Sequence, residues 1–145
     1  MNAAALDTNM FLYAHIADYE IHAKVRHWLS EFLDNCECFY ISWQIFYEYI
    51  RIATHPKLHE KPLTVLQALD DLRPYLSDSR CKILKETSAH QQVFQELVTV
   101  VPFAKGNFIH DCHFAALLKE HAVKTIVTLD SDFLKFKFLN VISPI

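Results

Sequence analysis

Short apolar runs alternate with longer segments of helical periodicity, and this alternation constrains the fold more than any other feature of the chain. The expected strands are 3–6, 38–41, 81–84, 124–129 and 141–143. The expected helices are 10–17, 21–33, 42–54, 63–75, 88–98 and 107–122. Strands that alternate with helices predict an α/β fold with a mainly parallel central sheet of four to five short strands flanked by helices.

Capping residues indicate where two of these helices begin. Ser42 is a favoured N-cap type and precedes the helix that runs to about Thr54. Ser88 and Gln91 fit a capping box, in which two side chains satisfy backbone amides reciprocally, and we expect this box to open the helix 88–98. Pro56 ends the helix of Ser42, because the residue before a proline avoids the helical region.

Length and composition favour one compact unit, a single domain over residues 1–145. The chain has one glycine, Gly106, and no Gly/Ser run that would serve as a flexible linker. Apolar residues make up 52% of the sequence and include 11 Phe. A chain of this length does not easily bury that much apolar surface. We therefore expect an interface with a second copy or a partner.

Charge and segment patterns exclude several classes of protein. The formal net charge is −3, so no strongly basic field exists to bind a long polyanion, and nucleic-acid contact would need local cations and a metal. No uncharged apolar run reaches about 18 residues and no signal peptide is apparent, so we expect a cytoplasmic protein with no membrane contact. The cysteine spacing does not match a zinc finger, and we expect free thiols at Cys36, Cys38, Cys81 and Cys112.

Acidic residues stand where the expected strands meet the helices. Asp7 follows the first strand, and Asp130 and Asp132 follow the fourth. Ligands bind beyond the carboxyl ends of parallel strands, so these acids share one rim if the two strands are neighbours. Two unit charges 4 Å apart repel by about 4 kcal/mol at an effective dielectric of about 20. A fold that gathers several carboxylates therefore predicts a divalent cation.

Each of these acids also has a structural interpretation. Asp7 is a good helix cap, although Thr8 and Asn9 are cap types as well and would leave Asp7 free to face a metal. Asp130 and Asp132 favour a turn. In an extended chain, however, side chains at i and i+2 point the same way, which suits two ligands of one ion.

Two further acids lie on helices that are otherwise apolar on one face. Glu48 shares a face with Ile45 and Ile52, where a carboxylate is costly to bury unless it is paired or binds a metal. An ion pair with Arg51 at i+3 is the alternative, and the helix alone does not decide between them. Asp111 lies in a first helical turn, where the macrodipole stabilises a carboxylate, but on the inward side of that helix.

Taken in order, four stretches make the chain resemble the PIN-domain family, in particular the VapC-type ribonuclease toxins of type II toxin–antitoxin systems. These stretches are Leu6-Asp7-Thr8-Asn9, the segment 48–56 (EYIRIATHP), Asp111 with its Ala115-Ala116 helix, and Thr128-Leu129-Asp130-Ser131-Asp132-Phe133. No stretch is specific alone, but the ordered set covers essentially the whole chain.

The resemblance implies a PIN fold and a metal-dependent endoribonuclease that hydrolyses RNA phosphodiester bonds. It implies a Mg²⁺ or Mn²⁺ site with Asp7, Glu48, Asp111 and Asp130 as the catalytic acidic quartet and Asp132 as an accessory metal ligand. It also implies a homodimer and a cognate antitoxin protein as partner, with RNA as the substrate.

Two other functions compete with this interpretation. The first is a non-catalytic PIN-like module that binds metal or RNA, and the presence of all the acids argues against it. The second is an aspartate-dependent phosphohydrolase, which Asn9 disfavours because a second Asp is expected at that position. His110 and His113 flank Asp111 on different helical faces, so we expect them to be solvated or packed rather than ligands.

Overall fold

A computed structural model describes residues 1–145 and contains a five-stranded sheet with the strand order β3-β2-β1-β4-β5. The strands are β1 (Ala3–Leu6), β2 (Cys38–Ile41), β3 (Cys81–Ile83), β4 (Thr125–Val127) and β5 (Asn140–Ile142). All four neighbouring pairs are parallel. The predicted α/β fold with a mainly parallel sheet is therefore confirmed, with β1 and β2 at their expected bounds.

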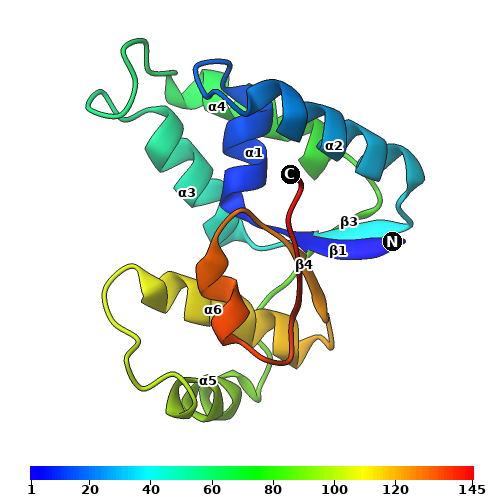
Figure 1. Ribbon diagram of the computed structural model, residues 1–145, viewed down its shortest axis with the longest axis vertical. Coiled ribbons are helices and arrows are strands. Elements are labelled where there is room, and N and C mark those ends of the chain that lie inside the picture. The colour runs from blue at the N-terminus through cyan, green and yellow to red at the C-terminus, as the bar shows by residue number, and fades with distance from the viewer.

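Helices cover both faces of this sheet. They are α1 (Thr8–His15), α2 (His22–Asn35), α3 (Trp43–Ala53), α4 (Val65–Leu76), α5 (His90–Thr99), α6 (Phe108–Glu120) and the short 3-10 helix η1 (Ser131–Lys135). Figure 1 shows α1 to α4 on one side of the sheet and α5 and α6 on the other. No helix combines the length and the apolar character that crossing a bilayer requires.

Successive strands are added first on one side of β1 and then on the other. The chain moves outward from β1 to β2 and β3, and then returns to the opposite side of β1 to form β4. Leu6 pairs with Val127, so the residues that follow, Asp7 and Thr128, leave the sheet side by side. Such a switch point is where open parallel sheets place their ligands.

The two helical layers explain why the strands are apolar. Because helices lie on both faces, strand side chains are buried in both directions, and Ala4, Ala5 and Leu6 are at most 1% exposed. On the α1 side, Phe11 packs edge-to-face against Phe46 and Tyr75, with ring centroids 5.4 and 4.9 Å apart. Each such buried side chain stabilises the fold by roughly 1.5–3 kcal/mol.

One of the two expected caps is present and the other is not. The Ser42 hydroxyl accepts a hydrogen bond from the Ile45 amide at 3.4 Å and caps α3 as expected. The capping box expected at Ser88 is wrong, because α5 begins at His90 with no side-chain cap. The Thr87 hydroxyl accepts the Ala89 amide at 3.2 Å instead, so the turn before α5 is built one residue earlier.

The capping box of this chain opens α4. The Thr64 hydroxyl accepts the Gln67 amide at 3.2 Å, and Gln67 Oε1 accepts the Thr64 amide at 2.9 Å. Two amides at the helix start are thereby satisfied, which is the role that the sequence pattern had suggested for Ser88 and Gln91.

We expect Thr64→Ala to lower the free energy of unfolding by about 1 kcal/mol, because the orphaned Gln67 amide loses its acceptor. Ser88→Ala removes the same hydroxyl from an exposed position with no cap and should change stability by less than about 0.5 kcal/mol. Urea denaturation of both variants measures the difference. A larger loss for Ser88→Ala would contradict this assignment of the caps.

Candidate metal centre

Asp7 follows β1 directly and is itself the N-cap of α1, with 6% of its surface exposed. Its Oδ1 accepts the Thr8 amide at 2.8 Å, and its Oδ2 accepts the Thr128 hydroxyl at 2.7 Å and the Asn9 amide group at 3.2 Å. The expectation that Thr8 and Asn9 cap this helix is wrong, because both lie inside it. Asp7 can cap α1 and still face the site, because the cap bond uses only one of its two carboxylate oxygens.

Asn9 and Thr128 join the carboxyl ends of β1 and β4. The Asn9 amide group donates to the Thr128 hydroxyl at 3.1 Å, and Asn9 Oδ1 accepts the Leu129 amide at 3.2 Å. The Thr128 hydroxyl also accepts the Asp130 amide at 2.9 Å. This network orients both the Asp7 side chain and the loop that carries Asp130.

Asp130 and Asp132 lie at the start of η1 rather than in an extended segment. Asp130 Oδ1 accepts the Asp132 amide at 2.9 Å and caps this turn, so the expected strand-like alignment of the two side chains is wrong. They still converge with Asp111 of α6, because one ligand oxygen from each of the three carboxylates lies within 4.8 Å of the others. Lys135 pairs with Asp132 at 2.8 Å from the solvent side.

Glu48 reaches the site from α3, on the other side of the sheet from α6. Its Oε2 accepts a hydrogen bond from the Thr8 hydroxyl at 3.2 Å. The alternative of an ion pair with Arg51 is not formed, since Arg51 is absent from the salt bridges of the molecule. Arg51 is exposed instead and lines the same cavity as Glu48.

A cavity of about 450 Å³ opens between these elements. It is lined by Gln44, Tyr47, Glu48, Arg51, Asn107, Phe108, His110, Asp111, Asp130 and Asp132. A small adjoining pocket is bordered by Asp7 and again by Glu48 and Asp111. The structure thus gathers four of the predicted acids around the cavity and places Asp7 at its inner end.

The crowding of these carboxylates changes their protonation. Burial raises the pKa of Asp7 to about 6, and the charges of Glu48 and Asp130 add to that effect. Burial also raises the pKa of Asp111 to about 8, together with repulsion from Asp7 and the three other acids of the cluster. Repulsion of this kind is relieved by protonation or by a bound cation.

The donor set fits a hard divalent cation. Carboxylate oxygens are the ligands that Mg²⁺ and Mn²⁺ prefer, and no Cys or His belongs to this cluster. The residues able to hold such an ion are Asp111, Asp130 and Asp132, whose oxygens are closest together, with Glu48 and Asp7 behind them.

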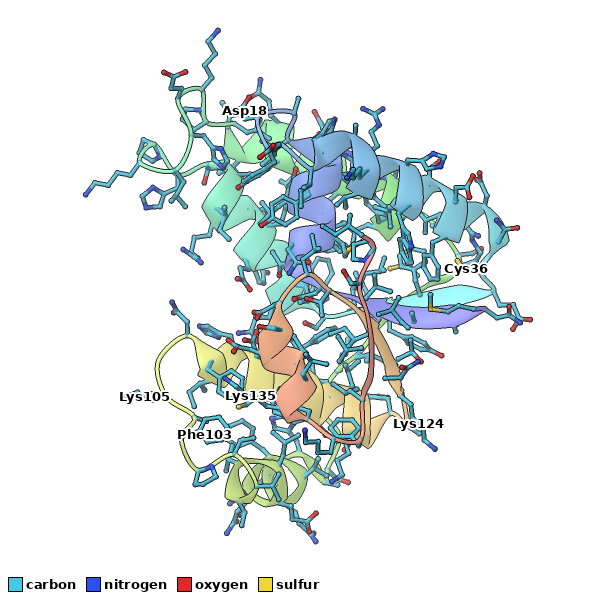
Figure 2. The ribbon with its side chains drawn as sticks, viewed as in Figure 1. Asp18, Cys36, Phe103, Lys105, Lys124 and Lys135 are labelled. Atoms are coloured by element: carbon cyan, nitrogen blue, oxygen red, sulfur yellow. The ribbon has the colours of Figure 1, made fainter.

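Aromatic side chains support one wall of the cavity. Lys135 lies over the rings of Phe108 and Phe103 at 4.9 and 5.3 Å, and Figure 2 shows Lys135 and Phe103 facing each other from η1 and the α5–α6 loop. Phe133 and Phe136 are buried, and the Phe136 ring stacks on that of Phe108 with centroids 5.6 Å apart. Sequence reasoning missed Gln44 as a cavity residue, because nothing in its local pattern marks it.

Several known proteins are similar to this chain in sequence or in fold. The PIN domain family matches residues 4–139. Ribonuclease VapC48 of Mycobacterium tuberculosis is 26% identical over 95% of this chain and 94% of its own length. Ribonuclease VapC37 of the same species is 29% identical over 91% of this chain and 90% of its own length.

Among solved structures, the crystal structure of VapBC2 from Rickettsia felis bound to a DNA fragment from their promoter contains a chain with the same fold. Its TM-score is 0.68 at 20% identity, and the superposition covers 97% of this chain and 98% of that one. The family match spans nearly the whole sequence. The chain belongs to the PIN domain family.

Proposed function

We propose that this chain is a metal-dependent endoribonuclease that hydrolyses RNA phosphodiester bonds and acts as the toxin of a type II toxin–antitoxin pair. The observation that carries the proposal is the convergence of distant acids on one cavity at the switch point of the sheet. The ribonuclease names of relatives that align over most of the chain support the same activity.

In this proposal Asp7, Glu48, Asp111 and Asp130 are the catalytic acids that hold Mg²⁺ or Mn²⁺, and Asp132 is an accessory ligand. When bound, such an ion polarises a phosphoryl oxygen and lowers the pKa of a coordinated water. The chain's own contribution is positioning, because Thr128 and Thr8 donate hydrogen bonds that fix the carboxylates of Asp7 and Glu48.

The cations at the mouth of the cavity suit a phosphate backbone. Arg51 is exposed on the α3 wall, and Lys135 approaches from η1 through its contact with Asp132. These local charges offset the overall net charge of −3, which would otherwise repel RNA. Because RNA is the substrate, we place the activity in the cytoplasm.

We further propose that residues 1–145 are one domain that forms a homodimer and binds a cognate antitoxin protein. Two large apolar side chains, Trp43 and Tyr47, are exposed at 45% and 67% and lie next to each other on α3, with ring centroids 6.3 Å apart. Such surface is typical of protein interfaces. The structural neighbour supports an antitoxin as partner, because its name describes a VapBC complex rather than a single protein.

Loss of a metal ligand should impair catalysis. Asp7→Asn and Asp111→Asn should each reduce cleavage of total cellular RNA by roughly 100-fold or more, because a lost ligand removes several kcal/mol of charge stabilisation. Cleavage by the unmodified protein should stop with EDTA and return with excess Mg²⁺ or Mn²⁺.

Asp70→Asn is the matched control, since Asp70 is an exposed carboxylate that only pairs with Arg73 on α4. It should leave cleavage unchanged. Full activity in both site variants would overturn the proposal. Metal binding without any cleavage would favour the non-catalytic module instead.

Without metal, the stability of the fold should depend on pH. The ordinary carboxyl pKa is 3.8, whereas folding raises that of Asp7 to about 6 and that of Asp111 to about 8. The folded state therefore binds more protons than the unfolded state between about pH 4 and pH 8, so the free energy of unfolding should fall as pH rises through this window.

Asp111→Asn should remove the part of this loss that occurs near pH 8 and be more stable than wild type there, because its neutral amide is not repelled. Mg²⁺ should flatten the wild-type profile by compensating the same charges. Chemical denaturation in EDTA at several pH values measures both effects. A wild-type profile that is level from pH 5 to pH 9 would contradict the crowding of these acids.

A further inference from the structure

A second group of side chains with metal-binding character lies outside the acidic cavity. Glu86 comes from the loop after β3, His90 from the start of α5, and His113 from α6. One ligand atom from each lies within 4.8 Å of the others. Figure 1 shows α5 and α6 on the same face of the sheet, and this group joins the two helices.

The His90 ring is oriented by a buried carboxylate. Its Nδ1 contacts Glu120 Oε2 at 2.7 Å, and the Glu120 side chain is 0% exposed. Glu120 Oε1 is held in turn by the amide and hydroxyl of Thr87, at 3.0 and 2.8 Å. Because a carboxylate only accepts, Nδ1 carries a proton, and in the neutral ring Nε2 then keeps its lone pair. A histidine that binds a metal commonly has this outer contact.

The His113 ring is oriented in the same way. Its Nδ1 contacts the side-chain oxygen of Gln44, so Nδ1 is the donor and Nε2 is the nitrogen left for another partner. That nitrogen faces Glu86 Oε1 at 2.7 Å. A lone pair on Nε2 and a carboxylate oxygen repel each other, so this contact needs either a second proton on the ring or a cation shared by both groups.

We propose that Glu86, His90 and His113 form a second metal site that takes Zn²⁺ and is separate from the acidic centre. Two imidazoles and one carboxylate are a set that zinc accepts, with a further position left for water. The acidic centre offers only oxygen ligands, which favour Mg²⁺ or Mn²⁺. Ligand type therefore gives the two sites different preferences for metal.

Occupancy of this zinc site would link three segments that otherwise meet through side-chain pairs. It would join the loop before α5, α5 itself and the first half of α6. Gln44 contacts both His113 and His110, and His110 lines the acidic cavity. The proposal nevertheless rests on the geometry of the zinc ligands and holds whether or not the acidic centre cleaves RNA.

The competing explanation is that these contacts are only ion pairs of protonated histidines, His113 with Glu86 and His90 with Glu120. Ion pairs would bind no zinc and would weaken as the histidines lose their protons. The two explanations therefore differ in metal uptake, which is measured directly on the full chain.

The test uses metal-stripped, full-length protein without a histidine tag, in excess Mg²⁺ so that the acidic centre is occupied. Titration with Zn²⁺ by calorimetry should show one equivalent bound, and Co²⁺ should give the visible absorption of a nitrogen-ligated ion. Bound Zn²⁺ should raise the melting temperature by roughly 5 °C or more at saturating concentration, because it binds only the folded state.

His90→Gln and His113→Gln should each weaken Zn²⁺ binding by about 100-fold or more, since each removes a ligand. His27→Gln is the matched control, because His27 is a histidine on α2 whose side chain is 77% exposed. Glu86→Gln provides a further variant at a half-exposed side chain that should fold normally and weaken Co²⁺ binding. Asp130→Asn should retain zinc binding.

Three outcomes would overturn the proposal. The first is a wild-type chain that takes up no Zn²⁺ or Co²⁺ under these conditions. The second is binding that survives in His90→Gln, His113→Gln and Glu86→Gln. The third is binding that Asp130→Asn abolishes, because the ion would then occupy the acidic centre.

Discussion

A buried carboxylate, that of Asp7, is the constraint around which the functional rim of this molecule is organised. Its burial between the ends of β1 and β4 is unfavourable unless donors surround it, and the Thr8 amide, the Thr128 hydroxyl and the Asn9 amide supply them. Those same hydrogen bonds hold the two strand ends together. They also place the loop of Asp130 beside Asp7, so repulsion at the rim is built into the fold.

The two helical layers contribute to this rim from opposite sides. Glu48 arrives on α3 from the layer that contains α1, and Asp111 arrives on α6 from the other layer. A rim between two layers brings charges together without placing them on one exposed helix face. Burial, with the repulsion added to it, raises the pKa values of Asp7 and Asp111, and a divalent cation would neutralise that repulsion.

The proposed zinc ligands show that residues close together in the sequence can belong to different sites. His113 is two positions from Asp111, yet it points toward α5 and Glu86 rather than toward the acidic cavity. A packed or solvated histidine was expected there, because helical spacing separates the two helix faces but does not reveal which groups the second face contacts. Its partners Glu86 and Gln44 lie 27 and 69 residues away along the chain.

The alternation of apolar runs and helices was sufficient to predict the parallel sheet, and β1 and β2 to the residue, because burial on both faces leaves a local imprint on sequence. The acids that could bind a metal were also recognisable, since carboxylates after strands or on apolar helix faces are costly without a partner. Local patterns did not reveal that Asp7 caps α1, that Asp130 begins a 3-10 turn, or that Thr64 rather than Ser88 forms the capping box. Each of these hydrogen bonds is local, between residues one to three positions apart, so neighbouring polar residues compete for each role. For Asp7 and Asp130 the tertiary structure decides, because the Thr128 hydroxyl that bonds both of them reaches Asp7 only after β4 has docked beside β1.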